Sequence, residues 1–247
     1  MPTYSIIIPA YNEERRLGAA LEQLLAYAAA QGWDAEVLVV NDGSRDRTAA
    51  LAAEYAARHP VVRLLENPGN RGKGYSVRHG MLEAKGDLRL FTDADLSAPI
   101  AEAEKLFAAL AAGAEIAIGS RWLASETQTL RQPLYRQFFG RLFNLLLRLL
   151  LGLRFQDTQC GFKAFTRRAA LELFSRLRIE RWAFDPELLY LARRRGLKVE
   201  EVPVAWAHDR RSTISPLRDG PRMFWDLLRI RWYALTGKYS AAAEGIR

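Results

Sequence analysis

Two carboxylates separated by one residue, Asp93 and Asp95, follow an apolar stretch within the sequence DLRLFTDADLSAP at residues 87–99. Alternate side chains of an extended chain point to the same side, so both carboxylates can converge on one point at a strand end. Two anions that share a site repel each other unless a cation lies between them. Oxygen ligands without a nearby His or Cys favour a hard divalent ion, which predicts Mg²⁺ or Mn²⁺ bound by Asp93 and Asp95. An alternative is a polar turn in which Asp95 or Ser97 caps the next helix.

The elements around this pair alternate between strands and helices. Buried strands are predicted at 4–8, 36–40, 61–65, in the stretch before Asp93, and at 115–119. Segments of helical period ending near residues 27, 59, 84 and 112 follow the first four. This alternation predicts an α/β fold with a mostly parallel sheet flanked by helices. Ligands of such sheets bind beyond the carboxyl ends of the strands.

Polar side chains occupy the loops that follow these strands. They are Asn12 and Glu13, Asp42, residues 70–73, the Asp93 and Asp95 pair, and Arg121. This mixture suits a nucleotide diphosphate, with carboxylates for the metal and for the base or ribose, and with Lys73 and Arg121 for the phosphates. The glycine-rich segment ENPGNRGKG is not a P-loop, and no GxGxxG follows the first strand, so a plain flexible loop at 66–74 is the alternative.

Composition narrows the class of protein. The chain has 247 residues, of which 49% are hydrophobic, enough for one large α/β domain, which we favour, or for two small ones. The single cysteine excludes an internal disulfide, and a reducing compartment is expected. The net charge of +8 is concentrated at 121–155, with six Arg against one Glu, and at 208–238, with seven Arg and Lys against three Asp. Two basic patches predict a polyanionic partner for those faces.

Both basic patches contain amphipathic, aromatic segments. Segment 133–153, PLYRQFFGRLFNLLLRLLLGL, is interrupted by Arg136, Arg141 and Arg148 and is therefore no ordinary transmembrane span. On a helical wheel its polar residues gather on one side, a pattern of membrane-surface helices, although a core helix or a subunit contact would also fit. Segment 221–235, PRMFWDLLRIRWYAL, repeats the pattern. The N-terminus fits neither a signal peptide nor a transmembrane helix.

Six motifs occur in order: IIIPAYNEE, VLVVNDGSRDRT, NPGNRGKGYSVRHG, FTDADLS, GSRW and DTQCGFKAF. With them the chain resembles the family 2 glycosyltransferases of the GT-A fold, over roughly residues 4–235. It is most similar to the polyprenyl-phosphate hexosyltransferases, which include dolichyl-phosphate mannose synthases and, through DTQCGFKAF, dolichyl-phosphate β-glucosyltransferases. The resemblance implies one GT-A domain at 1–240 and a tail at 241–247.

The resemblance also implies roles for individual residues. Residues at the ends of the first two strands would border the nucleotide, Asp93 would face the donor sugar and diphosphate, and Asp95 would bind the metal. Arg121 and Arg136 would meet the acceptor phosphate, and Arg210 or Arg211 would neutralise the donor diphosphate. The nucleotide set comprises Pro9, Ala10, Tyr11, Glu13 and Asp42, and the sugar and acceptor set comprises Asp157, Gln159 and Lys163. Cys160 is expected to be an inert packed residue.

The acceptor decides whether a general base is needed. A phosphate monoester is already largely ionised near neutral pH, so Arg121 and Arg136 need only position it. A sugar hydroxyl would require a carboxylate base, for which Asp157, Asp185 and Glu187 are candidates; Asp185 could instead cap a helix.

We therefore expect an inverting, metal-dependent hexosyltransferase that uses UDP-glucose and a polyprenyl phosphate at an anionic membrane surface. It would be cytoplasmic and peripherally attached to the cytoplasmic face of the membrane. The alternatives are GDP-mannose as donor, a sugar hydroxyl as acceptor, or a non-catalytic nucleic-acid-binding protein suggested by the pI of 9.8. We expect no nucleic acid partner, and the sequence indicates no oligomeric state.

Overall fold

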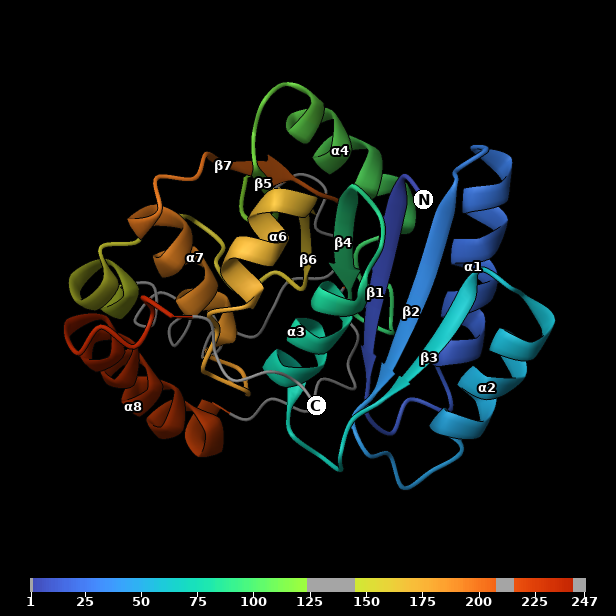
Figure 1. Cartoon of the computed structure of the whole chain (residues 1–247), viewed down its shortest axis with the longest axis horizontal. Helices are drawn as coiled ribbons and strands as arrows, with labels where there is room; N and C mark the ends of the chain where they lie inside the picture. Colours follow the sequence, from blue (N-terminus) through green and yellow to red (C-terminus); the bar gives the residue numbers. More distant parts are fainter. Residues whose placement is uncertain (1, 124–144, 208–215, 242–247) are drawn as a thin grey trace.

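The computed structural model describes residues 2–123, 145–207 and 216–241, and within α8 the side chains from residue 220 onward (Figure 1). Seven strands form one sheet in the order β3-β2-β1-β4-β6-β5-β7. The strands are β1 Tyr4–Ala10, β2 Ala35–Asn41, β3 Val62–Glu66, β4 Leu88–Thr92, β5 Ile116–Ser120, β6 Phe162–Thr166 and β7 Val199–Pro203.

The sheet is mostly parallel, as the sequence predicts. Among the seven described strands only β6 runs antiparallel to its neighbours, pairing Thr92 of β4 with Phe162 and Ile118 of β5 with Lys163. The carboxyl ends of the other six strands and the amino end of β6 therefore meet at one edge of the sheet. Any segment that leads into β6 is delivered to the edge where Asp93 lies.

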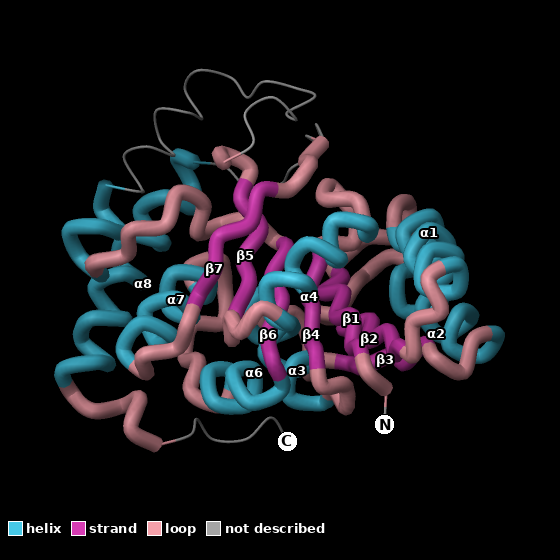
Figure 2. Tube along the Cα trace, turned by 90° about the horizontal axis from the view of Figure 1, so that it is seen from above, coloured by secondary structure: helices cyan, strands magenta, loops and turns pink. Residues whose placement is uncertain are grey.

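Helices cover both faces of the sheet, as Figure 1 shows and as the view from above in Figure 2 confirms. One face packs against α1 Leu17–Ala30, α2 Thr48–Arg58 and α4 Ala103–Ala111, which follows the short 3-10 helix η1 Ile100–Glu102. The other face packs against α3 Lys73–Glu83, α6 Arg167–Phe174 and α7 Phe184–Arg194, and the core on that side extends to η3 Leu147–Leu151 and α8 Pro216–Leu235. Successive residues of a strand point to opposite faces of the sheet, so Ile7 enters one core while Ile6 and Ile8 enter the other. Both faces are therefore apolar, and helices cover each of them in a three-layer arrangement.

The capping alternative for the DADLS turn is wrong. The helix after it begins at Ile100, and its N-cap residue, Pro99, offers no side-chain cap. The Asp95 carboxylate instead accepts a hydrogen bond from the backbone N–H of Ser97 at 2.9 Å, across Leu96 in the left-handed conformation (φ 45°). The turn is thus shaped around the Asp95 carboxylate.

The amphipathic segments divide between core and surface. Segment 133–153 is described from residue 145 onward, where Leu147 and Leu151 of η3 enter the core while Leu149 is 73% exposed. Helix α8 starts five residues before the predicted segment and buries Leu227 and Ile230. Its exposed residues include Phe224, Trp225, Trp232 and Leu235. None of the helices among the described residues combines the length and apolar character needed to cross a membrane.

Candidate active site

The predicted carboxylates Glu13, Asp93 and Asp95 gather beyond the ends of β1 and β4. Lys73, the first residue of α3, forms an ion pair with Asp93. Arg16 binds both oxygens of Glu13, at 2.6 and 2.7 Å, and its Nη1 lies 3.8 Å from Asp95 Oδ2. Burial, together with Asp95 and Asp93, raises the pKa of Glu13 above its ordinary value in spite of Arg16. The three carboxylates therefore act on one another electrostatically, and two cations balance them.

This donor set fits a hard divalent ion that completes its coordination with substrate oxygens. Within the described ranges no group of three or more His, Cys, Asp or Glu residues is arranged to hold a metal. Asp93 and Asp95 offer carboxylate oxygens only, and Mg²⁺-type ions are commonly held by one or two carboxylates plus phosphates. A cavity of about 300 Å³ opens beside Asp95 and is lined by Arg15, Arg16 and Leu96.

Asp42 holds the glycine loop, residues 67–74, against the end of β2. Its carboxylate is 3% exposed and accepts four hydrogen bonds. The donors are Asn67 Nδ2 at 2.8 Å and Arg71 N at 2.9 Å to Oδ1, and Asn70 Nδ2 at 3.0 Å and Gly72 N at 2.8 Å to Oδ2. The loop is therefore built around Asp42 rather than left as a plain connection. The predicted contact of Asp42 with the base or ribose stays a prediction.

Gly43 permits this close approach, and a pair of substitutions isolates the effect. A Cβ at Gly43 would lie 2.6 Å from the carbonyl carbon of Gly69, whereas one at Gly32 would meet nothing within 4 Å; both residues have positive φ, 68° and 63°. Gly32→Ala should cost about 1 kcal/mol of unfolding free energy, the ordinary penalty of the left-handed conformation. Gly43→Ala should cost a further 1–3 kcal/mol or so because backbone must move. Urea unfolding of both variants measures the difference, and equal losses would contradict a tight contact.

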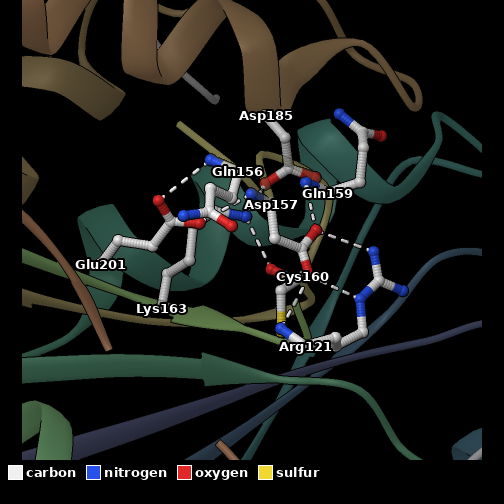
Figure 3. A network of polar contacts seen from close by, with 8 residues as sticks. All are labelled: Arg121, Gln156, Asp157, Gln159, Cys160, Lys163, Asp185 and Glu201. Atoms are coloured by element: carbon white, nitrogen blue, oxygen red, sulfur yellow. Dashed lines mark hydrogen bonds and ion pairs between the residues drawn. The ribbon is translucent and has the colours of Figure 1, made fainter. Parts of the chain in front are cut away.

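Arg121 and Asp157 form a clamp at the end of β5 (Figure 3). Arg121 donates to Asp157 from Nε at 2.6 Å, from Nη2 at 2.8 Å and from its backbone N at 3.0 Å. Burial disfavours the charged form of both residues, but the opposite charge of the partner has the larger effect. The pKa of Asp157 is therefore lowered and the pKa of Arg121 is raised. The Trp206 ring lies 5.2 Å from the Arg121 guanidinium carbon. Lys73 and Arg121, expected at phosphates, are thus both paired with carboxylates in this structure.

Lys163 and Asp185 form a second, fully buried pair. Lys163 donates to Asp185 Oδ1 at 2.5 Å and to the Cys160 carbonyl at 2.6 Å, and its side chain is 0% exposed. The expectation that Lys163 lines a sugar pocket is therefore wrong for this structure. Asp185 does not cap α7, whose N-cap residue is Ala183. Burial raises the pKa of Asp185 in spite of Lys163 and Lys73, and it raises that of Cys160 to about 12, which makes the thiol inert at neutral pH.

The remaining predicted residues fall into two groups. Pro9 and Ala10 end β1, and Tyr11 follows with 42% of its surface exposed. Arg136, Arg210 and Arg211 lie outside the described residues. The DTQCGFKAF residue Gln159 has a buried Nε2 that makes no hydrogen bond within the part of the chain that the structure describes.

Three residues around the site were not singled out from the sequence: Gly161, which lies within the DTQCGFKAF motif, and Trp182 and Glu201, which lie outside every motif. Glu201 of β7 accepts hydrogen bonds from the backbone N–H groups of Gln156 at 2.9 Å and Asp157 at 2.7 Å (Figure 3). It therefore holds in place the backbone that carries the Asp157 carboxylate. Gly161 packs so closely on Asp93 and Lys73 that any Cβ would collide with them. The Trp182 ring lies 5.8 Å from Lys73 Nζ. All three reach the site from the second half of the chain, where DTQCGFKAF is the only one of the six motifs.

Comparison with known proteins agrees with this geometry. The model of the family "Glycosyl transferase family 2" matches residues 5–174. The chain is 40% identical over 252 residues to a dolichyl-phosphate beta-glucosyltransferase of Drosophila melanogaster, covering 97% of this chain and 77% of that protein. It is 36% identical over 248 residues to the Homo sapiens protein of that name, covering 95% and 76%. A glucosyl-3-phosphoglycerate synthase of Mycobacterium tuberculosis, crystallised with Mn²⁺, UDP and glucosyl-3-phosphoglycerate, superposes with a TM-score of 0.68 at 19% identity, covering 99% of this chain and 82% of that chain. The GT-A fold is confirmed.

Proposed function

The chain belongs to glycosyl transferase family 2, and we propose that this glycosyltransferase moves glucose from UDP-glucose to a polyprenyl phosphate, with inversion at the sugar carbon. The two named relatives are dolichyl-phosphate beta-glucosyltransferases, at 40% and 36% identity. The GT-A neighbour was crystallised with UDP, which supports a uridine donor. GDP-mannose is the alternative donor.

The pairing of the candidate bases is the observation that favours a phosphate acceptor. Asp157 is paired with Arg121, and Asp185 is paired with Lys163. Glu187 accepts hydrogen bonds from three donors in the core. A hydroxyl acceptor needs a carboxylate that can take a proton at the reacting oxygen. A phosphate monoester brings its own anionic oxygen and needs only cations and donors to place it.

In this mechanism the site separates two tasks. Asp93 and Asp95 would hold a divalent ion, Mg²⁺ or Mn²⁺, which would supply positive charge to stabilise the leaving diphosphate. Glu13 and Tyr11 border the nucleotide, and Asp42 keeps the glycine loop beside it. Arg121, oriented by Asp157, and Arg136 position the acceptor phosphate for attack from the opposite side of the sugar.

We place the reaction at an anionic membrane surface, with the protein attached peripherally to the cytoplasmic face. Support comes from α8, where Trp225 is 65% and Trp232 61% exposed on a helix that also carries Arg222, Arg229 and Arg231. Aromatic rings at the headgroup level combined with Arg are typical of interfacial helices. Each basic residue near such a surface contributes about 1 kcal/mol.

Labelled transfer tests donor and acceptor together. Radiolabelled UDP-glucose and GDP-mannose are each incubated with a short polyprenyl phosphate and Mn²⁺, and the organic extract is counted. Label from UDP-glucose should enter the lipid, and Arg136→Ala should reduce this transfer while leaving the thermal shift produced by the donor unchanged. Arg58→Ala, at an exposed position on α2, is the control. The acceptor assignment would be wrong if the enzyme hydrolysed its donor, labelled no lipid and did not sediment with anionic vesicles. The donor assignment would be wrong if label entered the lipid from GDP-mannose alone.

A further inference from the structure

Glu187 of α7 is a buried carboxylate that the reaction does not use. It is 0% exposed, and its oxygens accept hydrogen bonds from the backbone N–H of Arg178 at 3.0 Å, the backbone N–H of Ile179 at 2.8 Å and the Tyr239 hydroxyl at 2.6 Å. Burial raises its pKa to about 7 in spite of these donors. Charged hydrogen bonds of this kind are strong, and breaking one leaves a buried group unsatisfied.

The segment that Glu187 holds, residues 178–182, forms one wall of the glycine loop. The Glu180 carbonyl accepts the backbone N–H of Tyr75 at 3.0 Å, and its carboxylate pairs with Arg71 at 2.5 Å. Contact is tight, because a Cβ at Gly74 would lie 2.7 Å from the Ile179 carbonyl oxygen. Movement of residues 178–182 would therefore move the loop.

From the loop the contacts continue to the metal-binding carboxylates. Lys73 sits between Gly72 and Gly74, pairs with Asp93, and lies beside the Trp182 ring. The position of its ammonium group sets how strongly Asp93 is neutralised before a divalent ion and the donor bind.

On its other side, Glu187 is joined to the chain that follows α8. Tyr239 is 5% exposed, and its carbonyl accepts Arg195 Nη2 at 3.0 Å, while the neighbouring Lys238 carbonyl accepts Arg178 Nη2 at 2.9 Å. Helix α7, between α6 and α8 in Figure 1, thus fastens residues 236–240 and 178–182 to the same carboxylate.

We infer that Glu187 and Tyr239 are positioning residues of the donor site, which fix residues 178–182 and through them the glycine loop and Lys73. This inference rests on the proposed nucleotide-sugar site, and it assigns to Glu187 a task other than that of a base. It also connects the segment behind α8 to the geometry of the metal-binding carboxylates.

The test compares two tyrosines that are each 5% exposed and whose hydroxyls each bind a glutamate. Tyr239→Phe removes the hydroxyl that donates to Glu187, and Tyr55→Phe removes the hydroxyl that binds Glu22 at 3.0 Å on the other face of the sheet. Amide hydrogen exchange at residues 71–76 should be faster in Tyr239→Phe and unchanged in Tyr55→Phe. The KM for the donor that the enzyme turns over should rise about fivefold in Tyr239→Phe, the effect of one lost hydrogen bond, with kcat within about twofold.

Glu187 variants provide a graded check. Glu187→Gln keeps one acceptor oxygen for a backbone N–H and should fall between Tyr239→Phe and Glu187→Ala in both exchange and KM. If Tyr239→Phe loses stability as Tyr55→Phe does, yet keeps wild-type exchange at 71–76 and wild-type donor KM, the pair is merely structural and the inference is wrong. Because exchange is measured without donor, a wrong donor or acceptor assignment would leave this readout intact and would be recognised separately.

Discussion

Asp95→Asn is expected to reduce kcat/KM for sugar transfer by about 10²–10³-fold while the protein stays folded. Asn keeps the oxygen that accepts the Ser97 N–H, so the turn at residues 93–97 is retained and only the negative charge is lost. A neutral amide is a weaker ligand for a hard divalent ion, and the metal concentration for half-maximal rate should increase. Turnover measured against Mn²⁺ and Mg²⁺ concentration provides both quantities.

Asp87→Asn is the matched control for this experiment. Asp87 lies just before the opposite end of β4, where its side chain is 73% exposed and 3.8 Å from Arg167, so turnover should stay within about twofold of wild type. Metal-dependent turnover retained in a folded Asp95→Asn protein would refute the role of Asp95. Loss of activity in both variants would point instead to an effect on β4.

The carboxylates at the strand ends were predictable because they depend on local pattern alone. Asp42 and Asp93 each follow a β-branched or apolar run, and parallel strands bring their carboxyl ends to one edge whatever the rest of the chain does. The loop order along the chain therefore already indicated a shared site. The structure places Glu13, Asp93 and Asp95 close enough to shift the pKa of Glu13.

The partners of the cations could not be predicted in this way. Arg121 and Asp157 are 36 residues apart, and they meet because β6 enters the sheet antiparallel, between β4 and β5. Its residues FKAF are compatible with either direction, since strand direction is set by the connection and not by the side chains. Assigning Arg121 to phosphate therefore overlooked Asp157, the carboxylate that the second half of the chain delivers to it, whereas Lys73 pairs with Asp93 from the first half.

Asn41, at the end of β2, is fixed by local partners. Its amide donates to Glu66 at 2.6 Å, and its oxygen accepts the Ser44 N–H at 3.2 Å. Asn41 is 3% exposed, so an acid there would place two carboxylates side by side in a buried setting. Neighbouring strands β2 and β3 thus determine the residue that the turn can hold.

The second large effect is expected on stability, in Lys163→Met. The substitution leaves Asp185 buried without its main cation, and removing one partner of a buried pair costs about 3–5 kcal/mol of unfolding free energy. Lys73 remains near Asp185 but is itself bound to Asp93, so it restores only part of the balance. Urea unfolding near pH 8 should show the full loss.

The same variant should become more stable as the pH falls, which separates a charge effect from a packing effect. Burial already holds the folded-state pKa of Asp185 above its ordinary value, and losing Lys163 raises it further. A carboxyl whose folded pKa exceeds its unfolded pKa, about 3.9, binds more protons in the folded state, so stability decreases as pH rises above that value. At pH 5 a larger fraction of Asp185 is protonated and uncharged than at pH 8, so the loss in Lys163→Met should be smaller at pH 5.

Two further variants distinguish an unpaired charge from a cavity. The Lys105 side chain is 52% exposed and pairs with Glu102 at the surface. Lys105→Met should therefore cost less than about 1 kcal/mol of unfolding free energy at either pH. The double variant Lys163→Met, Asp185→Leu removes both charges and should recover most of the stability at pH 8, as buried pairs replaced by apolar residues often do. The loss in Lys163→Met could instead be equal at pH 5 and pH 8 and persist in the double variant. That result would assign the effect to packing around Phe91 and not to the charge of Asp185. The Phe91 ring lies 5.4 Å from Lys163 Nζ.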